Sequence, residues 1–120
     1  MANRYDLLRE KLPPSYVEFI DSNGEWEGDL GDELGYVVTW NRKLIQENWV
    51  GYEMAEYPSD RWFPFGSNGG GEMLCFDLLS GSDNVFWIPY IGMSSNEDAM
   101  AQPFTFADVA AAIRKSRAAR

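Results

Sequence analysis

Histidine is absent from the 120-residue sequence, and cysteine occurs once, as Cys75. Without histidine the chain has no Ser-His or Cys-His nucleophile pair and no imidazole metal ligand. A single cysteine cannot form an internal disulfide, so nothing in the sequence indicates an oxidising compartment. Cys75 lies between Leu74 and Phe76 in an apolar run. Because a catalytic thiol needs a base or a helix N-terminus beside it, we predict that Cys75 packs in the core.

Basic residues are scarce over most of the chain. The formal net charge is −9, and no lysine or arginine occurs between Lys11 and Arg42 or between Arg61 and Arg114. Four of the ten bases lie in the C-terminal stretch, as Arg114, Lys115, Arg117 and Arg120. An acidic body repels nucleic-acid phosphate and anionic lipid and attracts basic proteins. We therefore expect a basic protein partner, no nucleic acid and no membrane; simple solubility is the other explanation of the charge.

Long apolar runs are also missing. No stretch approaches the roughly 20 residues of a membrane span, and the N-terminus lacks the apolar core of a signal peptide. These absences favour a cytoplasmic protein. The length fits one domain over residues 1–120, and we see neither an internal repeat nor a low-complexity linker that would divide it.

Helical patterns alternate with turn residues along the chain. Residues 4–11 predict a short helical turn, and residues 12–24 predict a helix that opens at two prolines and stops at Asn23-Gly24. Its apolar residues recur at helical spacing, as Leu12, Tyr16, Phe19 and Ile20. Asn41 can cap a third helix over residues 42–57, with a helical face of Ile45, Trp49, Tyr52 and Glu56. A fourth helix is predicted in residues 104–120.

The last helix carries the clearest boundary signal. Thr105 and Asp108 approximate a capping box at its start, and bases in its last turn suit the helix dipole. Its predicted apolar face consists of Phe106, Val109, Ala110 and Ile113.

Strand-like runs rich in aromatic and β-branched residues occupy 34–40, 61–66, 72–79 and 84–92. Residues 25–33 and 93–103 are interpreted as loops. The short connections between the last three runs favour antiparallel hairpins over crossovers. We therefore predict an α+β fold: a central antiparallel sheet of about four to five strands, with N-terminal, middle and C-terminal helices packed on it.

Three glycines in a row, Gly69, Gly70 and Gly71, raise the question of a phosphate-binding loop. The run lacks the lysine and Ser/Thr of a P-loop, and a strand pattern rather than a helix follows it. Glu72 and the acidic body would also repel phosphate. We therefore predict that these glycines join two antiparallel strands, with at least one residue at positive φ.

The acidic segment 21-DSNGEWEGDLGD-32 has part of the pattern of a calcium-binding loop. Oxygen-bearing residues fall in a 12-residue frame, but Trp26 occupies the sixth position, where such loops need glycine, and the twelfth residue is not glutamate. We therefore predict no metal site. The remaining interpretations are a solvated acidic loop and a partner-contact surface around a tryptophan anchor. The candidate partner-binding residues are Glu18, Asp21, Glu25, Trp26, Glu27, Asp29, Asp32 and Glu33.

No catalytic residue and no cofactor is predicted. Paired carboxylates can hydrolyse glycosides, but nineteen acids produce many chance pairs, so such a pair has no specificity here.

Three stretches resemble, in order, the motifs of a known family. They are 12-LPPSYVEFIDSNG-24, 62-WFPFGSNGGGEMLCFDL-78 and 104-FTFADVAAAI-113, and together they are similar to the SUKH superfamily, the Smi/Knr-like domain. The resemblance spans nearly the whole chain. The residues that match the fold's motifs are Leu12, Pro13, Tyr16, Phe19, Gly69, Gly70, Gly71 and Asp77.

The resemblance implies an α+β fold with a central antiparallel sheet and a binding role without catalysis. Bacterial members of the superfamily are mostly immunity proteins that bind and neutralise a cognate toxin, often a nuclease, of a polymorphic toxin system. Fungal members are regulatory binding proteins. We therefore expect an immunity protein for a basic toxin domain, with a non-toxin regulatory protein-binding module as the alternative. In the first case, the acids of residues 18–33 would steer the encounter before Trp26 is buried.

Overall fold

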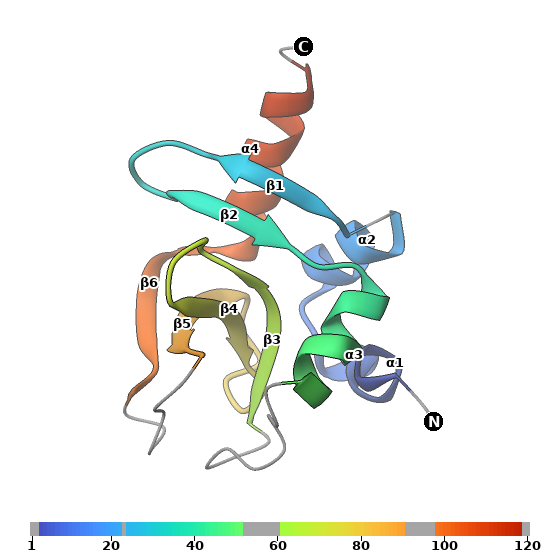
Figure 1. Cartoon of the computed structure of the whole chain (residues 1–120). Coiled ribbons are helices and arrows are strands. Elements are labelled where there is room, and N and C mark those ends of the chain that lie inside the picture. The colour runs from blue at the N-terminus through green and yellow to red at the C-terminus, as the bar shows by residue number, and fades with distance from the viewer. Residues whose placement is uncertain (1–2, 23, 52–60, 91–97, 119–120) are drawn as a thin grey trace.

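The apolar and aromatic runs of the sequence form the inner strands of one sheet (Figure 1). This computed structural model describes residues 3–22, 24–51, 61–90 and 98–118, and within them the sheet has six strands in chain order. The strands are β1 (Trp26–Asp29), β2 (Tyr36–Thr39), β3 (Trp62–Ser67), β4 (Glu72–Asp77), β5 (Asn84–Pro89) and β6 (Met100–Thr105). Every neighbouring pair is antiparallel. The predicted α+β fold is confirmed, with six strands where four to five were expected.

The helices of the described part of the chain pack on this sheet in two pairs. They are α1 (Arg4–Leu8), α2 (Pro14–Ser22), α3 (Arg42–Gly51) and α4 (Phe106–Ala118), and a short 3-10 helix η1 (Arg9–Lys11) follows α1. Helix α1 packs on α3, and α2 packs on α4. Figure 1 shows the β1–β2 hairpin at one end of the curled sheet, with α1, α2 and α3 along one side. None of the described helices is long and apolar enough to cross a membrane.

Tyr16 of α2 lies at the centre of an aromatic core. Its ring centroid is 5.4 Å from that of Phe65 and 5.0 Å from that of Phe76, on neighbouring strands β3 and β4. It is also 5.2 Å from Phe106 at the start of α4, at an interplanar angle of 89°. Edge-to-face contacts of this kind stabilise aromatic clusters beyond simple burial. One side chain therefore joins α2, the sheet and α4.

The helix boundaries follow the predicted capping signals. The Asp108 carboxylate accepts the backbone N–H of Thr105 at 2.9 Å, and the Thr105 hydroxyl accepts that of Asp108 at 3.3 Å, which confirms the capping box. The Asn41 side chain accepts the N–H of Leu44 at 2.9 Å and so caps α3. The predicted part of that helix beyond Gly51, with Tyr52 and Glu56, lies outside the described residues.

Two strands contradict the sequence prediction. Residues 25–33 and 93–103 were expected to be loops, but they contain β1 and most of β6. Within the described residues both strands lie at an edge of the sheet, where each pairs with one neighbour. β1 is short and contains two acids and a glycine, and β6 contains Pro103, a residue that sheets accept at edges. An edge strand tolerates acids, glycine and proline, which disfavour an inner strand. The sequence of β1 and β6 therefore did not look like that of a strand.

The triple glycine forms the turn between β3 and β4, as predicted. Gly69 has φ +79°, and the N–H of Asn68 donates to the carbonyl of Glu72 at 3.2 Å. The Asn68 side chain accepts the N–H of Gly70 at 2.9 Å. A Cβ at position 69 would come within 2.5 Å of the ring of Tyr36. Gly69 therefore serves both the turn and the close approach of a neighbouring strand.

Asp77 ends β4 and closes the next turn. Its carboxylate accepts hydrogen bonds from Arg61 Nε at 2.7 Å and Nη2 at 2.6 Å. It also accepts the N–H of Leu79 at 3.0 Å, while its carbonyl accepts the hydroxyl of Ser80 at 3.0 Å. The guanidinium of Arg61 lowers the pKa of this carboxyl below its usual range. Cys75, two residues earlier, is fully buried, as predicted, and burial raises the pKa of its thiol well above the usual value.

Candidate partner-binding surface

The candidate acids lie on three parts of the fold and not on one loop. Glu18 and Asp21 belong to α2, whereas Trp26, Glu27 and Asp29 belong to β1. Glu25 immediately precedes β1, and Asp32 and Glu33 lie in the connection between β1 and β2. The β1–β2 hairpin therefore carries most of the set.

Pairing with β2 divides the β1 residues between two faces. Trp26 pairs with the buried Thr39, and Gly28 pairs with the buried Val37. Trp26 is half-buried against the core, and a Cβ on Gly28 would lie 2.7 Å from its indole. Glu27 and Asp29 point the other way, because successive side chains of a strand alternate. The predicted tryptophan anchor thus lies on the opposite face of β1 from these two acids.

Tyr36 extends the outer face of the hairpin, and sequence reasoning did not single it out. It pairs with Asp29, and its side chain is 41% exposed. Its phenol donates a hydrogen bond to the Glu27 carboxylate, and this bond raises the pKa of Tyr36. Because Tyr36 also lies over Gly69, the outer face runs from the acids of β1 to the glycine turn. The sequence run Tyr-Val-Val-Thr over 36–39 shows no polar–apolar alternation, so it held no signal that separated Tyr36 from its neighbours.

Asp32 and Glu33 line a pocket of about 620 Å³ between the hairpin and the C-terminal part of the chain. Its lining also includes Leu34 and four residues of β6 and α4, namely Pro103, Phe104, Asp108 and Ala111. Phe104 is buried, so the pocket combines an apolar floor with acidic walls. A lysine or arginine side chain fits this chemistry, because its aliphatic stem can pack on apolar surface while its charged head meets the acids.

Two of the candidate acids already have partners within the chain. Asp21 accepts hydrogen bonds from Arg9 at 2.5 Å and from the phenol of Tyr5 at 2.9 Å, so it ties α2 to the first turns of the chain. The hydrogen bond from Arg9 lowers the pKa of Asp21. Glu25 accepts a hydrogen bond from the side chain of Asn41 at 3.2 Å. These pairings give Asp21 and Glu25 structural roles at the edge of the acidic surface.

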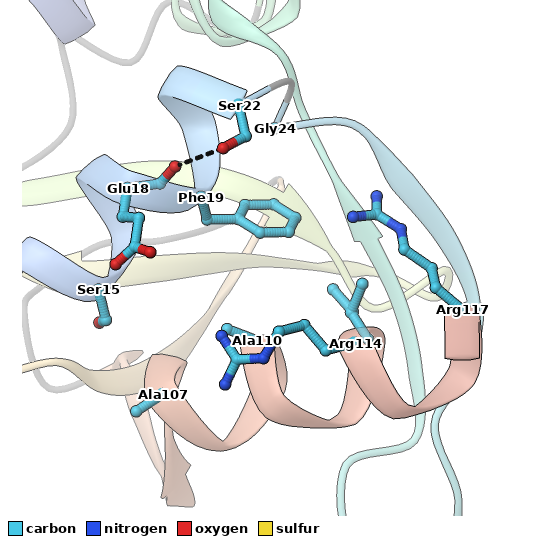
Figure 2. Close-up of a pocket in the computed structure, with 10 residues that line it drawn as sticks. Ser15, Glu18, Phe19, Ser22, Gly24, Ala107, Ala110, Arg114 and Arg117 are labelled. Carbon is cyan, nitrogen blue, oxygen red and sulfur yellow. Dashed lines mark hydrogen bonds between the residues drawn. The ribbon is translucent and has the colours of Figure 1, made fainter. Parts of the chain in front are cut away.

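Glu18 lies apart from the hairpin, on the wall of a groove between α2 and α4 (Figure 2). Among the matched motif residues of the same helix region, Leu12, Pro13 and Tyr16 are buried, and Phe19 is half-buried. Phe19 packs on Phe106 with ring centroids 5.3 Å apart. The motif residues thus hold α2 in place, while Glu18 faces outward.

Within the described ranges, no three His, Cys, Asp or Glu side chains come together as a metal site would require. Residues 21–32, which have part of the calcium-loop pattern, do not form a single loop. They extend from the end of α2 through β1 into the connection between β1 and β2. What the arrangement offers is recognition: an exposed acidic strand face, an exposed phenol and an acid-lined pocket with an apolar floor.

One comparison with known proteins finds a match. The family model described as SMI1 / KNR4 family (SUKH-1) matches residues 6–108. No curated protein matches the chain, and no solved structure matches it.

Proposed function

Because the chain belongs to the SMI1 / KNR4 family (SUKH-1), we propose that it is a cytoplasmic immunity protein. In this proposal it binds a cognate toxin domain of a bacterial polymorphic toxin system and neutralises it by stoichiometric occlusion. A basic nuclease domain is the partner that the charge favours, since the formal net charge of the chain is −9. No covalent step or cofactor is needed.

The observation that carries the proposal is the acidic outer side of the β1–β2 hairpin. Glu27 and Asp29 project from one face of β1, and Asp32 and Glu33 line the adjacent pocket. Nucleases that bind a phosphate backbone present lysine and arginine on the surface that does so. An inhibitor that offers carboxylates in a similar spacing competes for that surface directly.

Two steps make up the proposed mechanism. Long-range attraction between the acidic body and a basic toxin raises the encounter rate, and salt weakens this step. A lysine or arginine of the toxin then enters the pocket, where its stem packs on Phe104 and its charge meets Asp32 and Glu33. Tyr36, exposed and joined to Glu27, supplies an amphipathic contact of the type common at interface centres.

The first test is co-expression with a candidate nuclease toxin domain, sought among the genes that neighbour the gene of this chain. We expect growth to be restored and the two purified proteins to form a 1:1 complex in sizing chromatography with light scattering. If the toxin still kills and the proteins do not associate, the immunity function fails for that pair. Binding to a protein without toxicity would favour the regulatory alternative.

The second test locates the contact surface by charge reversal. Asp32→Lys with Glu33→Lys should slow association with the toxin domain by about tenfold or more and flatten its salt dependence. The matched control is Glu10→Lys with Glu47→Lys, which makes the same change in net charge at exposed positions away from the hairpin. If the association rates measured by stopped flow fall equally in both double variants, the effect comes from net charge alone. That result would refute the proposal that Asp32 and Glu33 contact the toxin domain.

A further inference from the structure

A second recessed surface lies on the other side of the acidic hairpin, between α2 and α4. The groove has a volume of about 480 Å³, within the range of roughly 300–1,000 Å³ that ligand sites occupy. Figure 2 shows the ring of Phe19 projecting from α2 into the space between the two helices. Ala107 and Ala110 of α4 line the opposite wall, and because their side chains end at Cβ they leave the groove open.

Charged side chains of both signs line this groove. Glu18 comes from α2, and Arg114 and Arg117 come from α4. In Figure 2 the dashed line joins the Ser22 hydroxyl to the backbone carbonyl of Glu18, so the Glu18 carboxylate takes no part in that bond. Within the described part of the chain, no salt bridge joins any of these three charged groups to a partner. Their charges are available to a ligand.

The two arginines bring positive charge to two places in the groove: in Figure 2 the guanidinium of Arg114 extends toward Ala110, and that of Arg117 extends toward Gly24. They are three residues apart on α4, and this spacing puts their side chains on one helical face. Guanidinium groups bind carboxylates through paired hydrogen bonds more specifically than an ammonium group does. Lys115, between them in sequence, does not line the groove. Of Arg114, Lys115 and Arg117, only the two arginines therefore line the groove.

We propose that the α2–α4 groove binds a peptide segment of a partner protein in which an apolar side chain is flanked by a carboxylate. The apolar side chain packs on Phe19, and the flanking carboxylate binds the guanidinium of Arg114. Arg117 adds favourable charge at the Gly24 end of the groove. Glu18 accepts a backbone N–H or a basic side chain at the other end of the segment. This contact is separate from the acidic β1–β2 hairpin. It selects an acidic ligand group, whereas the hairpin is proposed to bind a basic one.

Charge distinguishes this ligand from a nucleic acid. A continuous phosphate backbone would meet Glu18 in the groove itself and the acidic hairpin beyond it, and both repel phosphate. An isolated carboxylate on a peptide needs favourable charge at one point only. The groove therefore favours a short mixed-charge segment over a polyanion.

The experiment selects peptides from a phage-displayed library of random 12-residue sequences on the wild-type chain, with counter-selection on the Arg114→Ala/Arg117→Ala variant. We expect the selected peptides to be enriched in an acidic residue next to a large apolar residue. A synthetic copy should bind at least about tenfold more weakly to the double variant, which lacks the charge-assisted hydrogen bonds of Arg114 and the charge of Arg117. The control is Lys115→Ala, on which the affinity should be unchanged.

Amide chemical shifts then localise the contact. Addition of the peptide should move the signals of Phe19, Ala110 and Ile113, which line the groove. The proposal is wrong if the selected peptides are no more acidic than the library, if Lys115→Ala weakens binding as much as the double variant, or if the shifts map elsewhere. Tighter binding of a single-stranded oligonucleotide than of the peptide at the same groove would also overturn it. None of these outcomes depends on a toxin.

Discussion

Asp77→Asn is the substitution whose effect the structure determines most closely. The carboxylate is 5% exposed and pairs with an Arg61 side chain that is 31% exposed. Asparagine keeps the size of the side chain and one oxygen that can accept the N–H of Leu79. It presents an amide N–H₂ where Arg61 Nη2 has its carboxylate acceptor, so a partly buried guanidinium loses the charge of Asp77.

The magnitude follows from this difference in burial. Removing one partner of a fully buried ion pair costs about 3–5 kcal/mol, because the remaining charge is left uncompensated. Water reaches part of Arg61, so we expect a loss of about 2–3 kcal/mol in the free energy of unfolding. A domain of this size has roughly 5–15 kcal/mol in total, so the variant should fold but unfold at clearly lower urea concentration.

The matched control is Asp21→Asn, the same substitution in a pair with Arg9 whose side chains are 51% and 45% exposed. Exposed pairs contribute about 1 kcal/mol or less. Equilibrium urea unfolding followed by tryptophan fluorescence at pH 7 gives both values. If Asp77→Asn costs less than about 1 kcal/mol, or no more than Asp21→Asn, the reasoning from burial is refuted.

Acid should reduce the effect of Asp77→Asn. The folded-state pKa of Asp77 is lowered by its hydrogen bonds with Arg61, so its stabilisation is present above the unfolded value of about 3.9. That stabilisation is lost as the pH falls through the folded-state pKa. Asparagine does not titrate, so the stability gap between wild type and variant should narrow below about pH 4. A gap that is constant with pH would exclude the charge as its cause.

Two further substitutions test the turn and the core. Gly69→Ala should cost about 1–3 kcal/mol, because it places a Cβ at positive φ and against Tyr36. Gly71→Ala in the same turn meets nothing within 4 Å, and should range from neutral to about 1 kcal/mol stabilising; equal losses in urea unfolding would contradict this. Tyr16→Phe should leave stability unchanged or raise it by up to about 1 kcal/mol, since the buried Tyr16 hydroxyl has no hydrogen-bond partner among the described residues. A loss above about 1 kcal/mol in calorimetry would indicate that the hydroxyl is satisfied.

The inner strands could be predicted because burial on both faces leaves a strong signal. β3 and β4 are buried along almost their whole length, so their sequences read as continuous aromatic and aliphatic runs. The capping residues of α3 and α4 could be predicted for a related reason, since a cap is a local contact between near neighbours in sequence.

The edge strands could not be predicted, because what forms them is a partner strand and not their own composition. β1 has alternating half-buried and exposed residues over only four positions, too few to separate from a turn. Pairing with β2 determines which of its side chains share a face with the acids, and pairing with β5 brings β6 into the sheet. These pairings are contacts between separate segments of the chain, and a short stretch of sequence carries no information about them.

The candidate surface was recognised by charge but not by shape. The acidic segment stands out in the sequence, whereas its pocket depends on Pro103 and Phe104, about 70 residues further along the chain. Tyr36 was missed because its exposure follows from the register of the hairpin. Sequence reasoning therefore named a candidate region, and the fold supplied the geometry of that candidate.

The acids of β1 have a consequence for the behaviour of the protein in concentrated solution. An edge strand offers unpaired N–H and C=O groups onto which another chain can add, and within the described residues the sheet ends at β1 and β6. Here β6 is protected by Pro103, which has no N–H to donate, and β1 is protected by the mutual repulsion of Glu27 and Asp29 between copies. The same carboxylates that we propose to meet a partner therefore also act against edge-to-edge aggregation. Neutral substitutions at β1 would remove this protection, whereas a bound basic partner that covers the edge would replace it.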